Sequence, residues 1–285
     1  MVRRLTIAGV KDSALTNHGN LQAERLGKFF TKNALHFTHV FSSDLQRAYK
    51  TANTICSWND AAKGGKLEVT TLKVLREQDF GFYEGKPLYA RSRDSTKSGK
   101  DNHRSQHQDD PDFQDVESKE SMDSRMNTFL RDHLVPLLHN EKREKKEVVA
   151  IVSHGIILSH LWRCFLKLLP KNSVTLSPGL SVGTGVTPLE YLGGWSNTGY
   201  LELDVQKKWP ATNNAAKASR SPPCSSESPS IDGSTPTLHE YKVIVKTVNG
   251  KEHLQGLKRT RIVGSSKYDE DQKSIESFFK KRMVG

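Results

Sequence analysis

The stretch from Val148 to Trp162 constrains the fold of this chain more than any other. Val148 to Val152 is a continuous, mostly β-branched apolar run, which is typical of a parallel strand covered on both faces. The run ends at His154 and Gly155, and a helix is predicted to follow from Ile156 to Leu169. Open α/β sheets bind ligands beyond the carboxyl ends of such strands, where the first amides of the following helix favour anions. His154 and Gly155 are therefore candidate anion-binding residues, although His154 could simply cap the helix.

Arg47 is a second candidate, because it lies just past another predicted strand. Phe37 to Ser43 reads as that strand, and Asp44 is expected to be the N-cap of a helix from Leu45 to Trp58. A cation in the first turn of a helix is mildly unfavourable against the helix dipole. Something anionic should therefore offset the charge of Arg47. This could be a surface ion pair with Asp44, or a phosphate held by the planar guanidinium fork.

Glu77 is the third candidate and follows a third predicted strand, Leu67 to Leu75. It could pair with its neighbour Arg76 and have no further role. However, three ionisable residues, Arg47, Glu77 and His154, each stand just past a predicted strand, and such a coincidence indicates one shared site at the sheet edge.

Composition limits the class of protein. The chain has 285 residues, 35% apolar and 26% charged, as expected for a soluble globular protein with one sizeable core or two small ones. Its three isolated cysteines predict neither disulfides nor a zinc site, and we expect no secretion signal and no membrane anchor. The net charge of +11 lies mainly in the tail, where 15 lysines and arginines face 8 acidic residues from Gln206 onward. This charge points to partners of the tail, and direct nucleic-acid binding is not expected.

The remaining segments predict a main domain with appended flexible parts. Helices are expected from Thr16 to Leu35 and from Met122 to Leu138, and strands at Leu5–Val10, Val186–Leu192 and Tyr200–Val205. The expected organisation is a domain over 1–209 with a polar lid at 88–120, a disordered linker or insertion at 210–237, a β-hairpin at 238–256 turning at Asn249-Gly250, and a flexible basic tail at 257–285. His103, His107, Asp109 and Asp110 only superficially resemble metal ligands, and we expect no metal site in the lid.

Five segments together resemble the histidine phosphatase superfamily, the phosphoglycerate mutase-like family. They are DSALTNHGNLQAERLG, FSSDLQRAYKTA, LREQDFGFYEGKP, VAIVSHGIILSHL and WSNTGYLEL, which stand in the family's order over residues 12–203. The resemblance implies three layers, a mostly parallel central sheet with helices on both faces. It implies that Arg47 and Gly155 bind phosphate, that Glu77 is the general acid and that His154 hydrogen-bonds the transferring phosphoryl group, without a cofactor. Phosphoryl transfer needs such donors around the phosphate oxygens and a proton for the leaving group.

One family element has no counterpart here. The family begins with an apolar strand ending in Arg-His-Gly, whose histidine becomes phosphorylated, and no such motif precedes Ile7. The resemblance places that strand beside Val148–Ser153, so its loss should leave an inner strand without a backbone partner. We therefore expect this chain as given to be inactive, and we regard an incomplete gene model or splice form as the explanation to test first.

Three functions remain open. The first is a phosphomonoester hydrolase acting through a phosphohistidine whose nucleophile segment is missing from this chain, on a phosphorylated small molecule or phosphoprotein. The second is a non-catalytic binding or scaffold protein on the same fold, and the third is a phosphoglycerate mutase. The resemblance does not separate them, since one fold hosts many functions.

The tail carries a separate motif. Its glutamine, aliphatic residue and two aromatic residues have the spacing of the box that binds the replication sliding clamp: Gln272, Ile275, Phe278 and Phe279. In one helical turn the three apolar side chains fall on one face and could fill a groove, although the turn could also dock on the protein itself or form an unstructured end. Clamp binding would place part of an otherwise cytoplasmic, intracellular protein in the nucleus.

Overall fold

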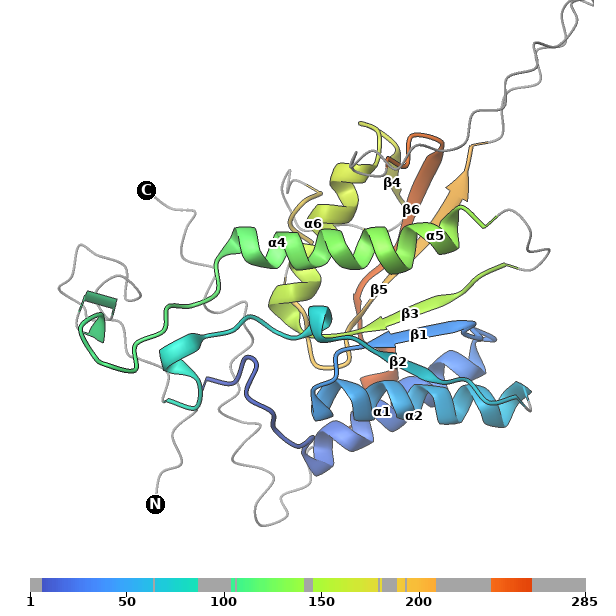
Figure 1. The fold of residues 1–285 in the computed structure, drawn as a ribbon. Coiled ribbons are helices and arrows are strands. Elements are labelled where there is room, and N and C mark those ends of the chain that lie inside the picture. The colour runs from blue at the N-terminus through green and yellow to red at the C-terminus, as the bar shows by residue number, and fades with distance from the viewer. Residues whose placement is uncertain are drawn as a thin grey trace, which may run out of the picture.

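The computed structural model describes residues 7–63, 65–86, 104–105, 107–140, 146–178, 180, 189–192, 194–208 and 237–257. The clamp-like motif of the tail, the 210–237 segment up to residue 236 and most of the 88–120 segment lie outside these residues. Within them the protein is an α/β structure whose helices lie on two sides of its strands (Figure 1). The predicted fold class is confirmed.

The parallel part of the structure forms the sheet that was expected. Strands β1 (His39–Ser42), β2 (Val69–Thr71) and β3 (Val149–Val152) pair in the order β2-β1-β3, and both ladders are parallel. Helix α2 (Gln46–Lys63) follows β1, and helix α6 (Gly155–Leu168) follows β3. All three strands therefore direct their carboxyl ends to one edge, as a site built from Arg47, Glu77 and His154 requires.

Alternate side chains of these strands enter two separate hydrophobic cores. Phe41 and Ile151 pack in the core beneath α4 (Lys119–Phe129) and α6, together with the fully buried Met126. Val40 packs on the opposite side, beneath α2 and α1 (Asn17–Lys32). This two-sided burial explains why the β3 segment reads as a continuous apolar run.

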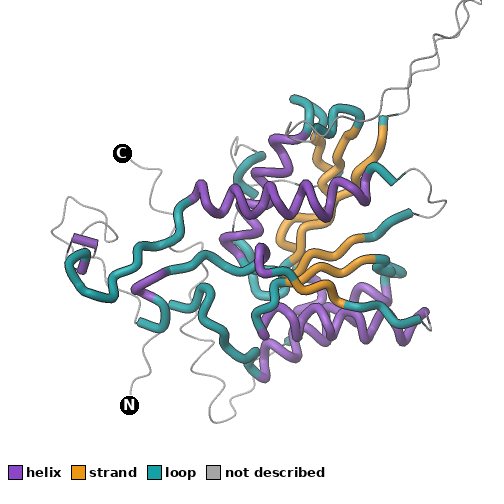
Figure 2. The backbone as a smooth tube through the Cα atoms, in the orientation of Figure 1, coloured by secondary structure: helices purple, strands orange, loops and turns teal. Residues whose placement is uncertain are grey.

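A second sheet contains the rest of the strands. Strands β4 (Val174–Leu176), β6 (Tyr241–Gly250) and β5 (Tyr200–Lys207) pair in the order β4-β6-β5, with β5 antiparallel to β6. In the view of Figure 2 the two groups of strands diverge from a common end. Among the described residues no ladder joins β3 to β5, and all four residues of β3 are only partly buried despite being apolar.

Several predicted elements differ from the structure. The predicted 67–75 strand is shortened to β2, and its end forms the 3-10 helix η1 (Lys73–Leu75). Asn249-Gly250 does not turn a hairpin: the 238–256 segment forms the single strand β6 and the short 3-10 helix η4 (Glu252–Leu254). The Asn249 side chain instead accepts a hydrogen bond from Ser196 N at 3.0 Å, and this bond ties the strand end to the 196–199 turn. The described residues of the expected strand 186–192 form a turn and irregular chain, although Leu189 and Leu192 still pack on the core.

Another difference concerns the beginning of the chain. Ile7 and Ala8 are not in a strand, and the first six residues lie outside the described part.

The predicted 122–138 helix is present but is interrupted by a π-helical turn, η3 (Leu130–Leu134), before α5 (Val135–Leu138). Pro136 explains the interruption, because a proline cannot donate to the carbonyl four residues earlier and its ring collides with it.

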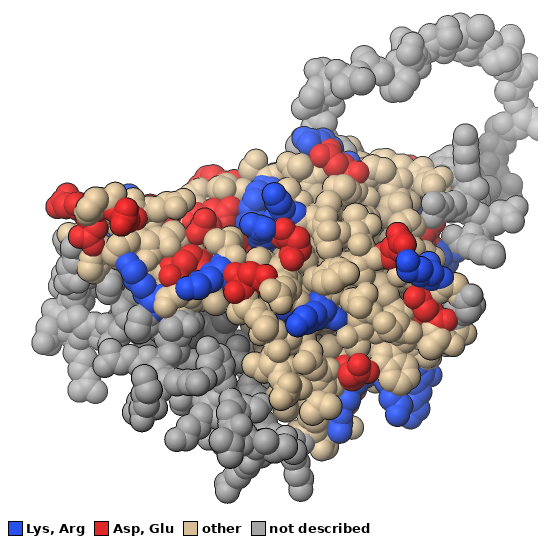
Figure 3. Space-filling model, turned by 60° about the horizontal axis from the view of Figure 1, so that its bottom comes forward, with Lys and Arg blue, Asp and Glu red and all other residues tan. Residues whose placement is uncertain are grey.

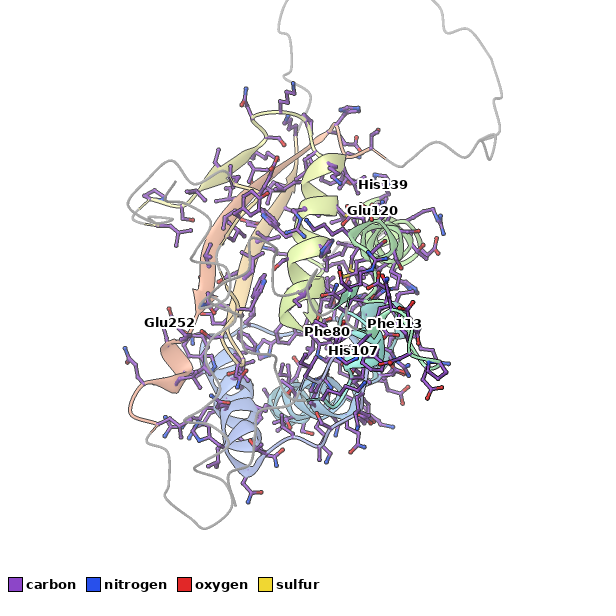
Figure 4. The ribbon with its side chains drawn as sticks, turned by 90° about the vertical axis from the view of Figure 1, so that its left-hand side faces the viewer. Phe80, His107, Phe113, Glu120, His139 and Glu252 are labelled. Carbon is purple, nitrogen blue, oxygen red and sulfur yellow. The ribbon has the colours of Figure 1, made fainter. Side chains whose placement is uncertain are left out.

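The base of the predicted lid is attached to the segment after Glu77. The 3-10 helix η2 (Gly81–Tyr83) meets it, and Phe82 N donates to Gln114 O at 2.8 Å. Gly81 has φ +52°, and a Cβ there would overlap the Gln114 carbonyl. Figure 4 shows Phe80, His107 and Phe113 together on one side of the view, with Glu252 on the other side.

The helices and polar clusters of the described part were compared with what a membrane span or a metal site requires. None of its helices is long and apolar enough to cross a bilayer, and within it no three His, Cys, Asp or Glu side chains converge as metal ligands. His107 pairs with Asp110 at 2.9 Å instead. On the face drawn in Figure 3, acidic and basic side chains are interspersed, so the described part of that face shows no broad single-sign area.

Candidate functional site

The structure brings Arg47 and His154 into direct contact. Arg47 Nε donates to His154 Nδ1 at 3.2 Å, although the two residues are 107 positions apart in the chain. Each is delivered by its own strand and helix, since Arg47 stands in the first turn of α2 and His154 is the N-cap residue of α6. The shared edge predicted from the sequence is therefore present.

The two alternatives to a functional Arg47 and Glu77 are both wrong, because Asp44 and Arg76 pair with each other. Arg76 Nε and Nη2 donate to the two carboxylate oxygens of Asp44 at 2.8 and 2.6 Å. This fork lowers the pKa of Asp44 and raises that of Arg76. The predicted N-cap role of Asp44 also fails, since Asp12 Oδ1 accepts from Gln46 N at the start of α2.

Arg47 is held by the loop that precedes α1. Its Nη2 donates to Gly9 O at 2.6 Å and its Nη1 donates to Lys11 O at 3.2 Å. With the bond from Nε, described residues use three of the five N–H donors of the guanidinium. One N–H on each terminal nitrogen is left for a ligand, which is the fork that binds two oxygens of a phosphoryl group.

His154 is held as a neutral imidazole of one tautomer. Burial, followed by the positive charge of Arg47, lowers the pKa of His154 from 6.5 to about 3. Because Arg47 Nε carries a hydrogen, His154 Nδ1 must accept, so the ring proton lies on Nε2 and points at Ser43 Oγ, 3.0 Å away. A neutral ring with its proton on Nε2 can donate one hydrogen bond, which goes to Ser43 Oγ here and reaches a phosphoryl oxygen only if the Ser43 bond is exchanged for it.

The side chain of Glu77, and not that of His154, accepts hydrogen bonds from the amides at the start of α6. Its carboxylate accepts from Ile157 N at 3.1 Å and from Ile156 N at 3.3 Å, whereas the His154 side chain makes no cap bond. The first helical amide, that of Gly155, has no acceptor within the helix and shares this end with the carboxylate. The simple capping role considered for His154 is thus excluded.

Glu77 has the properties of a proton donor. Its side chain is buried, with 6% exposure, and burial raises its pKa even though three backbone amides and Arg47 act in the opposite direction. A carboxyl group with a raised pKa retains its proton closer to neutral pH, as a general acid must.

A cavity of about 350 Å³ opens beside Glu77. Its wall includes Arg76, Lys73, Ser121 and Arg125, and it extends from Glu77 toward α4 and the base of the lid. Arg47 and His154 do not line it. Glu77 therefore adjoins both the Arg47–His154 pair on one side and a space large enough for an organic group on the other.

Comparison with known proteins is consistent with this geometry. The family model described as the histidine phosphatase superfamily (branch 1) matches residues 2–193. A probable phosphatase of Schizosaccharomyces pombe is 27% identical over 98% of the chain and 76% of that protein. Phosphoglycerate mutase-like protein 4 of Arabidopsis thaliana is 43% identical over 79 residues, 28% of this chain and 32% of that protein.

Another relative and a solved structure also resemble the chain. Fructose-2,6-bisphosphatase TIGAR of Xenopus tropicalis is 39% identical over 77 residues, 27% of this chain and 26% of that protein. The solved structure of mycobacterial hydrolase 1 superposes with a TM-score of 0.53 at 19% identity, covering 86% of this chain and 91% of the other, and shows a shared fold. The plant and frog relatives are thus matched over about a third or less of their length.

Proposed function

The chain belongs to the histidine phosphatase superfamily, and we propose that its function is phosphomonoester hydrolysis through a phosphohistidine. The observation that supports this most is the contact of Arg47 with His154 beside the buried acid Glu77. This grouping provides donors for a phosphoryl group and a proton for the leaving group, which are the two requirements of the reaction.

Each residue has one role in the proposed reaction. Arg47 holds the equatorial oxygens while the phosphoryl group moves from the ester oxygen to an imidazole nitrogen. His154 joins it by transferring its Nε2 hydrogen bond from Ser43 Oγ to a phosphoryl oxygen. Glu77 gives its proton to the departing alkoxide, and the resulting carboxylate then removes a proton from the water that hydrolyses the phosphohistidine. The leaving group occupies the 350 Å³ cavity, where Arg76 and Lys73 reach it.

The attacking imidazole is not assigned to any described residue. His154 is the one described histidine that contacts Arg47, and both of its ring nitrogens already make hydrogen bonds. Because no described histidine is assigned as the attacking group, a second candidate function is a binding or scaffold protein that holds a phosphorylated ligand without cleaving it.

An N-terminal extension separates the two candidates. A variant extended by an apolar strand ending in Arg-His-Gly should hydrolyse an alkyl phosphomonoester, and His154→Ala or Arg47→Ala should lower its kcat/KM at least about 100-fold. Glu77→Gln should impair the alkyl ester more than an aryl ester, whose leaving group needs no proton. An extended, folded variant without turnover would favour the binding function, and equal losses on both esters would remove Glu77 from the acid role.

A further inference from the structure

Glu84 makes an unusual set of contacts outside the reacting groups. Its two carboxylate oxygens accept hydrogen bonds of 3.0 to 3.1 Å from three consecutive amides, those of Gly9, Val10 and Lys11. The amide of Phe80 also donates to Glu84 Oε1 at 3.0 Å. Four backbone donors on one carboxylate form a strong, charge-assisted anion nest.

The opposite side of the same loop faces Arg47. The carbonyls of Gly9 and Lys11 accept from the Arg47 guanidinium, while the amides of these residues bind Glu84. Loop 9–11 is therefore hydrogen-bonded on one side to the Glu84 carboxylate and on the other side to the Arg47 guanidinium.

The packing around loop 9–11 leaves no room for a side chain at position 9. A Cβ at Gly9 would overlap the Gln78 carbonyl oxygen and lie 2.5 Å from the Phe80 ring, so the loop can approach Glu84 only because residue 9 is glycine. Glu84 is fixed in turn, since its own amide donates to Gly81 O at 3.0 Å in the turn that closes η2. The position of the two carbonyls thus depends on Glu84.

We propose that Glu84 is a positioning residue that sets the phosphate-binding fork of Arg47 through loop 9–11. This rests on the proposed role of Arg47. Two carbonyls and His154 Nδ1 fix the plane of the guanidinium, and Glu84 fixes both of the carbonyls. Without the carboxylate, the three loop amides lose their common acceptor, and the guanidinium is no longer held in one orientation toward the phosphate site.

The test is a double-mutant cycle with inorganic phosphate as the probe, read by NMR titration of the full chain. Glu84→Gln replaces one acceptor oxygen with a donor that opposes the loop amides, and should weaken phosphate binding about tenfold. In the Arg47→Ala background the same change should have no further effect. Glu68→Gln, at an exposed ion pair with Lys66, is the matched control and should leave the affinity unchanged.

A second readout needs no ligand. The ¹⁵N shift of His154 Nδ1 reports the bond from Arg47, and Glu84→Gln should move it while Glu68→Gln should not. Wild-type phosphate affinity and an unmoved His154 signal in folded Glu84→Gln would overturn the proposal, as would an equal loss of affinity with and without Arg47. If Arg47→Ala itself leaves phosphate binding unchanged, the proposed function fails, and the His154 signal still tests the positioning role.

Discussion

Acidification should destabilise the protein through His154. The imidazole has its ordinary pKa of 6.5 in the unfolded chain and a pKa of about 3 in the folded protein. Between these values the unfolded state binds a proton that the folded state does not, so stability falls as pH decreases. The contribution is complete above pH 6.5 and is lost progressively toward pH 3.

The magnitude follows from these two values. Between pH 7 and pH 5 the linkage relation gives a loss of about 2 kcal/mol in the free energy of unfolding. This is an upper value, because the His154 side chain is only partly buried in the structure. The loss comes from moving the ring away from water and beside the Arg47 guanidinium.

Urea unfolding of the wild type and His154→Asn at both pH values isolates this effect. Asparagine does not titrate, while His253, whose pKa burial lowers to about 4, titrates in both proteins and cancels in the difference. The stability of the wild type relative to His154→Asn should fall by up to about 2 kcal/mol from pH 7 to pH 5. A difference that does not change with pH, or an NMR titration of His154 with an inflection near 6.5, would refute the reasoning.

Two further predictions concern the chain as given and its tail. Incubated with an aryl phosphate, the purified 285-residue chain should form no acid-labile phosphohistidine and show background turnover, because Arg47 and His154 can hold a phosphoryl group but cannot attack it; robust turnover that His154→Ala abolishes would contradict this. A peptide spanning Asp269 to Arg282 should bind purified sliding clamp, and replacing Phe278 and Phe279 by alanine should abolish the binding; no binding at tens of micromolar would eliminate the clamp hypothesis.

The catalytic candidates could be predicted because strand ends carry a strong signal. A buried parallel strand reads as an apolar run, and the residue just past it lies at a known edge of the sheet. His154 follows such a run and Arg47 follows the shorter strand β1, whereas Glu77 stands beyond the 3-10 helix that ends the predicted 67–75 strand. The structure nevertheless places the three residues together. Sequence reasoning could not choose their partners, because the local neighbour of Asp44 is Arg47, whereas its actual partner, Arg76, lies 32 positions away.

Contacts to backbone atoms could not be predicted in the same way. Glu84 binds amides of residues 9–11, and an amide carries no mark in the sequence that would identify its partner 73 to 75 positions away. The glycine at position 9 was the only hint, since a close backbone approach requires one there. Strand β4 was also missed, because three residues are too few to show a period.

The incorrect prediction of a hairpin at 238–256 has a different cause. Asn249-Gly250 is a strong local turn signal, and Asn249 does adopt a positive φ of 48°. Its side chain, however, is used by the distant Ser196 turn, and β6 finds its partners in β5 and β4. Long-range pairing overrode a local preference that was itself read correctly.

The central claim is that the edge holding Arg47, His154 and Glu77 binds a phosphoryl group. The most direct measurement is a titration of the 285-residue chain with inorganic phosphate, followed by NMR at the amides of Gly155 and Ile156, for the wild type and Arg47→Ala. The account predicts saturable shifts at both amides in the wild type and at least a tenfold weaker affinity in Arg47→Ala. Shifts of equal affinity in the two proteins, or shifts that never saturate in the wild type, would contradict it.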